Sequence, residues 1–174
     1  AIFLIVCLVL FKQTKALKGY WLKIFVVGTL NTALPFALFS FATLTLTAGT
    51  ASVLNATAPM FGAIVAYFWL KDKLIPSAAV GLIIGFIGVY LLVSDNIHFS
   101  ATPATQAVEN NALLPTLAAM LAALCYGISA NYTKKYLSAI KPLALAAGSQ
   151  IAATTMLVPL SLFFIPETLP SANA

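Results

Sequence analysis

The sequence predicts an all-α polytopic membrane protein, and composition, apolar runs and lysine placement all point to that class. Of the 174 residues, 61% are hydrophobic and 7% are charged, and the mean hydropathy is +1.01. A soluble domain is about a quarter charged, so these residues cannot supply a water-soluble surface. We therefore expect the lipid bilayer to be the main partner of the chain.

Apolar runs of membrane-spanning length recur along the chain. A transmembrane helix needs about 20 mostly apolar residues, and the runs do not alternate as the strands of a barrel would. Proline near the start of three of the runs (Pro76, Pro115 and Pro142) is typical of a helix beginning, and Gly49 predicts a tight turn between the first two. The predicted helices cover residues 24–48, 50–70, 76–94, 112–132 and 142–165. Residues 1–11 are apolar but too short to span, and we expect them to be the tail of a further helix.

The lysines predict the orientation of these helices. All nine basic residues are Lys, and they follow residues 1–11, the second run and the fourth run. The alternate connections, at Gly49 and in the polar stretch 94–111, contain none. The positive-inside rule places the lysine-rich loops in the cytoplasm, which predicts a multi-pass protein of the cytoplasmic (inner) membrane. Lysines in such positions set topology, so no nucleic-acid partner is expected.

Catalytic chemistry has no visible basis in the sequence. No charged residue lies in the middle of a run, and there is no nucleotide-binding loop, metal-ligand spacing or nucleophile–base pair. His98 stands alone in the polar stretch and is interpreted as a solvated surface residue. We expect no enzyme activity, no cofactor and no metal.

Two asparagine–proline pairs mark candidate cavity positions. Asn31 and Pro35 are four residues apart, as are Asn55 and Pro59 in the next run, so each pair shares one helix face. A proline inside a helix leaves a carbonyl without its donor, and that carbonyl needs a partner or a water-lined cavity. The pairs could therefore line a substrate cavity. They could equally be interhelical glue, with the amides bonded across a dry interface.

Further small and polar positions allow similar alternatives. A stripe at helical spacing is either a packed seam or a face toward a substrate path, and it comprises Ser52, Asn55, Pro59, Gly62 and Ala66. Side chains that could line a cavity are Tyr126, Ser129, Asn131, Tyr132, Gln150 and Thr154. Three glycines predict close helix packing, namely Gly81, Gly85 and Gly88.

Several segments together resemble the EamA-type branch of the drug/metabolite transporter superfamily. The segments are 28–36 (GTLNTALPF), 46–60 (LTAGTASVLNATAPM), 69–74 (WLKDKL), the glycine-rich 81–93, 121–129 (LAALCYGIS) and 142–150 (PLALAAGSQ). The resemblance implies a helical bundle of two five-span inverted repeats, incomplete here. It assigns residues 1–95 to a first repeat lacking its first span, 96–111 to an external loop, and 112–174 to the first two spans of the second repeat.

The resemblance also implies a function and site residues. It places Asn31, Asn55, Pro59, Tyr126 and Ser129 at a central cavity of a secondary transporter that exports small metabolites by alternating access. Because these side chains are uncharged, we expect a neutral or zwitterionic small-molecule substrate. The acidic position is expected at the cytoplasmic end, where Asp72 pairs with Lys71 or Lys73 or caps a helix. Two alternatives from other classes stay open: a non-transporting scaffold or assembly subunit, and a passive channel.

Overall fold

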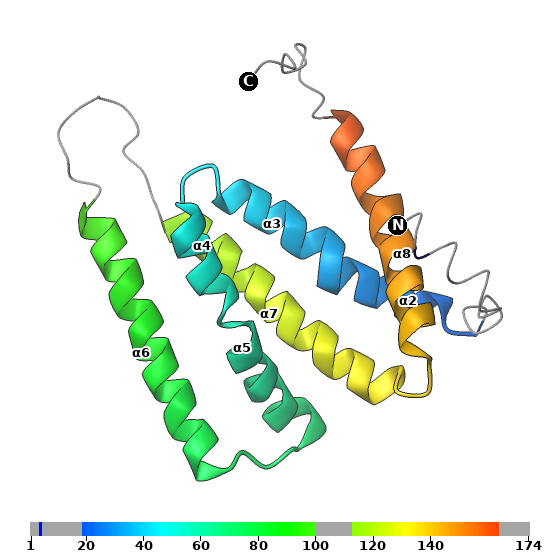
Figure 1. Ribbon diagram of the computed structural model, residues 1–174, viewed down its shortest axis with the longest axis horizontal. Coiled ribbons are helices and arrows are strands. Elements are labelled where there is room, and N and C mark those ends of the chain that lie inside the picture. The colour runs from blue at the N-terminus through cyan, green and yellow to red at the C-terminus, as the bar shows by residue number, and fades with distance from the viewer. Residues whose placement is uncertain (1–3, 5–18, 100–112, 164–174) are drawn as a thin grey trace.

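The five apolar runs form five helical segments long enough to cross a membrane (Figure 1). A computed structural model describes residue 4, residues 19–99 and residues 113–163, and all regular structure in these parts is helical. The predicted all-α polytopic fold is confirmed. Almost all of the expected partial helix at 1–11, and most of the expected loop at 96–111, lie outside the described residues. The membrane-length segments are Trp21–Ala42, Ala48–Leu70, Pro76–Ser94, Leu113–Tyr136 and Pro142–Pro159.

The first segment is interrupted by a π-helical turn. Helix α2 (Trp21–Gly28) continues into η2 (Thr29–Ala33) and then α3 (Leu34–Ala42). Pro35 has no N–H to donate to a carbonyl of the preceding turn, and a widened turn accommodates such a missing bond. The irregularity therefore follows from the proline position.

The hairpin between the first two segments lies before Gly49, so the expectation of a turn at Gly49 was wrong. Helix α3 ends at Ala42, and the turn runs through residues 43–47. The Thr47 hydroxyl accepts a hydrogen bond from the Thr50 N–H at 3.2 Å and caps the N-terminus of α4 (Ala48–Asn55). A threonine cap satisfies an otherwise free N–H, so the helix begins there and includes Gly49.

The second segment is also discontinuous. Helix α4 ends at Asn55, and α5 (Ala58–Val65) begins after two non-helical residues and continues into the π-helical η3 (Ala66–Leu70). At the break, the buried Thr57 hydroxyl donates to the Leu54 carbonyl at 2.6 Å. The Thr57 N–H also donates to this carbonyl, at 3.1 Å, so Thr57 bonds back to α4 through both its backbone and its side chain.

The remaining three helices are continuous. Helix α6 (Pro76–Phe99) extends past the expected end at Ser94, so residues 96–99 are helical although we expected them in a loop. Helices α7 (Leu113–Tyr136) and α8 (Pro142–Phe163) follow.

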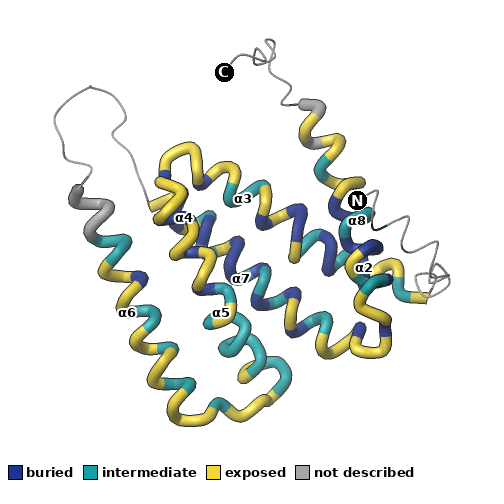
Figure 2. Tube along the Cα trace, in the orientation of Figure 1, coloured by how far each residue is buried: buried dark blue, intermediate teal, exposed yellow. Residues whose placement is uncertain are grey.

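Helix α7 is the centre of the arrangement. It packs against α3 and α5, while α8 packs against α2 and η2, and α6 stands at the edge beside α4 (Figure 1). Buried positions gather along α7, whereas α6 is largely exposed (Figure 2). Large apolar side chains on α6 such as Ile83, Ile84 and Ile87 are more than half exposed, as expected where lipid is the solvent.

Two clusters of buried side chains hold the bundle together at its two ends. One joins α2, the turn between α7 and α8, and α8 itself, and consists of Ile24, Val27, Leu137, Ile140, Ala144 and Ala147. The other joins α3, α4, α6 and α7, and consists of Ala42, Leu46, Leu54, Val89 and Ala119. Both contain alanines, whose small size lets neighbouring helices approach closely.

Candidate functional site

Irregular backbone lies near the middle of the first two membrane-length segments. The π-helical turn η2 carries Asn31, and Asn55 is the last residue of α4 before the break. Pro35 and Pro59 lack the N–H that would bond to the carbonyl four residues earlier, which in each case belongs to the asparagine. Non-helical backbone at membrane depth is tolerated only where protein buries it or a water-filled cavity solvates it. Each asparagine thus brings an amide and a carbonyl to one mid-span position.

The two asparagine side chains are exposed and unpaired. Among the described residues, neither Asn31 nor Asn55 has a side-chain hydrogen-bond partner. Pro59 is exposed like Asn55, so this pair shares an open face, whereas Pro35 is fully buried in α3 while Asn31 is open. Both amides are therefore free to hydrogen-bond groups other than the described residues.

The candidates on α7 are less open. Tyr126 is half-buried, and Ser129 is 1% exposed. The Ser129 hydroxyl has no hydrogen-bond partner in the described ranges, although buried hydroxyls normally have one.

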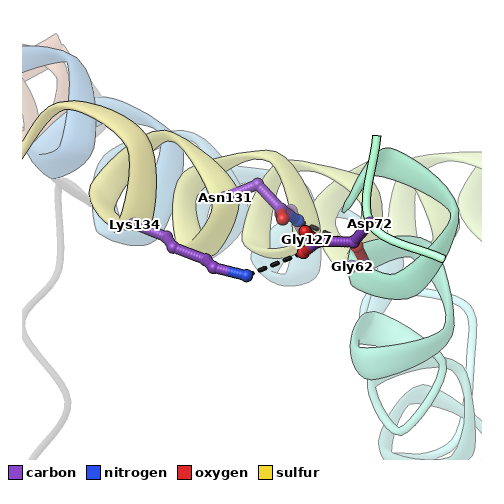
Figure 3. A network of polar contacts seen from close by, with 5 residues as sticks. All are labelled: Gly62, Asp72, Gly127, Asn131 and Lys134. Atoms are coloured by element: carbon purple, nitrogen blue, oxygen red, sulfur yellow. Dashed lines mark hydrogen bonds and ion pairs between the residues drawn. The ribbon is translucent and has the colours of Figure 1, made fainter. Parts of the chain in front are cut away.

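The amide of Asn131 has a different surrounding from those of Asn31 and Asn55. It is buried, and its side-chain N–H groups donate to the Gly62 carbonyl of α5 and to the Gly127 carbonyl of α7, both at 2.8 Å (Figure 3). Asn131 thus joins two helices. Sequence reasoning had grouped it with the cavity candidates, and the signal for its packing role is Gly127, which lies one turn earlier on the same helix.

The stripe on the second segment divides into two parts. Ser52, Asn55 and Pro59 are exposed, whereas Gly62 packs against Gly127. A Cβ atom added at Gly127 would lie 2.6 Å from the Gly62 nitrogen, so two helix backbones meet there. The stripe is therefore open from Ser52 to Pro59 and packed against α7 at Gly62.

Comparison with known proteins decides the family. Residues 1–94, more than half of the chain, match the EamA-like transporter family. The chain belongs to this family. It is also 24% identical over 149 residues to a protein of Archaeoglobus fulgidus named "Uncharacterized transporter", an alignment that covers 86% of this chain and 48% of the relative. The EamA-family chain thus spans about half the length of this curated relative, and no solved structure matches it.

The family match includes some candidate positions and not others. Asn31, Asn55 and Asp72 lie within residues 1–94 of the EamA-family chain, whereas Tyr126 and Ser129 lie beyond them. The asparagine pairs thus occupy the part of the chain for which membership is shown.

Asp72 is bonded to a helix that is remote in sequence. Its carboxylate lies 2.7 Å from the ammonium of Lys134 on α7 (Figure 3). The expected pairing of Asp72 with Lys71 or Lys73 was wrong. The left-handed backbone at Lys71 (φ 60°) ends η3, and the chain turns there beside the end of α7. The ion pair joins the end of the second segment to the end of the fourth.

Of the three α6 glycines that we expected to pack closely against a neighbouring helix, Gly85 alone has a close neighbour among the described residues. A Cβ atom at Gly85 would lie 2.7 Å from the terminal methyl of Met60, whereas nothing lies within 4 Å of one at Gly81 or Gly88. Among the residues that the structure describes, no group of three or more His, Cys, Asp or Glu could hold a metal ion.

Proposed function

We propose that the full-length protein containing this chain is a secondary transporter that exports small neutral or zwitterionic metabolites across the cytoplasmic membrane by alternating access. The observation that carries the proposal is the irregular mid-span backbone with exposed, unpaired amides at Asn31 and Asn55. Family membership supports a transporter in general.

The energetic argument concerns the polar groups at these two positions. An amide left without a hydrogen bond in an apolar medium costs several kcal/mol. The cost of an unpaired amide therefore indicates that the surface around Asn31 and Asn55 faces water, substrate or polar groups of the rest of the protein, and not lipid. Broken helices at a midplane site are a recurring feature of secondary transporters.

The proposed substrate class follows from the charges. No Asp, Glu, Lys or Arg lies near Asn31, Asn55 or Tyr126 in their spans. Uncharged amides and hydroxyls bond neutral or zwitterionic groups without needing a counter-charge. The proposed orientation places the lysine-bearing ends in the cytoplasm by the positive-inside rule, and the proposed export direction is carried over from the family resemblance.

The test measures flux in proteoliposomes that contain the protein encoded by the complete reading frame around these residues. Radiolabelled neutral L-amino acids are the probe, and counterflow against unlabelled amino acid is the readout. Asn55→Leu should lower the initial rate about tenfold or more at unchanged protein level, since a lost bond to substrate is worth roughly 1.5 kcal/mol. Val53→Leu, a substitution at a neighbouring exposed position of α4, is the control and should leave the rate unchanged.

The other two functions have distinct outcomes in the same assay. Flux that rises linearly with substrate concentration and shows no counterflow would indicate a passive channel. A scaffold would give no flux, and a cysteine at position 55 in a chain lacking Cys7 and Cys125 would then resist water-soluble maleimide. Normal flux in Asn55→Leu would remove Asn55 from the proposed site.

A further inference from the structure

Aromatic rings and lysines gather where three helical segments end together. Tyr132 and Tyr136 of α7 have ring centroids 4.8 Å apart, and the Trp69 ring of η3 lies 6.2 and 6.1 Å from them. Lysine side chains from α2 and α7 complete the group. This aromatic–lysine cluster consists of Tyr20, Lys23, Trp69, Tyr132, Lys135 and Tyr136.

The Tyr136 ring holds two ammonium groups. The Lys23 nitrogen lies 5.5 Å from its centroid and the Lys135 nitrogen 5.6 Å from it. Lys23 also lies 5.5 Å from the Tyr20 centroid, and Lys135 lies 5.1 Å from that of Trp69. Such distances are those of cation–π contacts, which position an ammonium without neutralising it.

Neither of these two lysines has a carboxylate partner among the residues described. The salt bridge in those residues joins Lys134 to Asp72, and Lys134 is not part of the cluster. Both ammonium groups contact the same ring, and an anion bound beside them would supply the counter-charge that neither has among these residues. The cluster is thus a positively charged position that lacks its counter-ion.

The cluster is anchored in the core. Tyr20 and Tyr132 pack against the buried side chains that join α2, α7 and α8, and Lys23 is half-buried. Tyr20 and Tyr132 therefore anchor one side of the cluster, whereas Lys135 and Tyr136 lie on its exposed side, where a ligand can reach them.

The position of the cluster at the ends of apolar helices indicates which kind of anion it would meet. The rings belong to residues at the ends of apolar helices, the position where Trp and Tyr meet lipid headgroups. Basic pockets between transmembrane helices bind anionic headgroups at that level. We propose that the aromatic–lysine cluster binds the phosphate of an anionic phospholipid between Lys23 and Lys135. This binding site is independent of what the protein transports.

The test is native mass spectrometry of the purified protein released from detergent micelles with phosphatidylglycerol or phosphatidylcholine. The unsubstituted protein should retain more phosphatidylglycerol than phosphatidylcholine. Lys23→Gln with Lys135→Gln should lower that retention roughly tenfold or more, since a lysine near an anionic lipid contributes about a fivefold factor. Lys73→Gln with Lys141→Gln removes the same charge from exposed positions outside the cluster and should lower retention far less. Lys23→Arg with Lys135→Arg keeps both charges and should bind at least as well, because a guanidinium also stacks on aromatic rings and pairs with phosphate.

Other outcomes overturn the proposal. Equal losses in the two glutamine pairs would indicate diffuse attraction to the whole basic end. Displacement of the lipid by millimolar inorganic phosphate would indicate a site for soluble phosphate instead. If Lys23→Gln with Lys135→Gln does not fold, Lys135→Gln alone decides, because this side chain is exposed, and retention equal to that of the unsubstituted protein contradicts the proposal.

Discussion

Gly127 and Gly62 meet backbone to backbone where α7 crosses α5. A Cβ atom at Gly127 would lie 2.6 Å from the Gly62 nitrogen and 2.9 Å from the Phe61 carbonyl carbon. Backbone atoms cannot rotate away as the end of a side chain can, so the helices would have to separate. The Asn131 amide bonds to the Gly62 carbonyl beside this crossing (Figure 3).

Gly127→Ala should destabilise the protein. The clash should cost about 1–3 kcal/mol, more than the gain in helix propensity of up to about 1 kcal/mol. The change in the unfolding midpoint is measured by heating the protein in detergent micelles. Unfolding is monitored through the reaction of the buried Cys125 thiol with a maleimide dye, in a Cys7→Ser background. Gly81→Ala, where nothing lies within 4 Å, is the control and should not lower the midpoint. A midpoint unchanged by Gly127→Ala would mean that the crossing is looser than described.

Asn131→Ala should lower stability, and Asn55→Ala should not. Asn131 donates two hydrogen bonds at 2.8 Å, whereas Asn55 is exposed and has no partner among the described residues. Interhelical bonds in membranes average about 0.6 kcal/mol and reach about 1.7 kcal/mol, so the midpoint should fall by a few degrees. The same thiol assay gives both values. Equal effects of the two substitutions would contradict the assignment of different roles to them.

Thr57→Val should weaken the second segment at its break. Thr57 is 1% exposed, and its hydroxyl donates to the Leu54 carbonyl at 2.6 Å. Valine keeps the shape but removes this bond, so the carbonyl keeps only the Thr57 N–H, at 3.1 Å, as a donor among the described residues. The loss of this one hydrogen bond should cost about 0.5–1.5 kcal/mol. Thr43→Val removes an exposed hydroxyl that bonds the Phe39 carbonyl, and water can replace that bond, so it serves as control. The two unfolding midpoints should therefore differ, and a larger loss for Thr43→Val would argue against the assigned bond.

Asp72 and Lys134 should be weakly coupled in a double-mutant cycle. Their side chains are 48% and 64% exposed, so solvent screens the 2.7 Å pair. The coupling from Asp72→Asn and Lys134→Gln should be about 0.2–1 kcal/mol and should shrink at high salt. The same cycle with Lys73→Gln should give a coupling near zero. A larger coupling to Lys73 would restore the partner expected from sequence.

Local sequence patterns were sufficient to predict the membrane-length helices and some of their ends. Runs of apolar residues and prolines near helix starts predicted all five segments, because the cost of burying charge or unpaired backbone in lipid acts on each segment separately. The turn before α4 was predicted in the wrong place, because the Thr47 cap is a stronger local signal than a glycine that a helix can also accommodate.

By itself, the sequence determined the fold class, the number of spans described and the mid-span positions of Asn31 and Asn55, since these depend on distances along one chain. Only the tertiary structure decided which polar groups are used for packing. Asn55 and Asn131 are both amides in apolar helices, yet one is open and the other joins α5 to α7. Likewise, the partner of Asp72 is Lys134, 62 residues away, rather than a neighbouring lysine. The physical reason is that a hydrogen bond or a close approach requires a particular neighbour, and helix packing alone brings distant residues together.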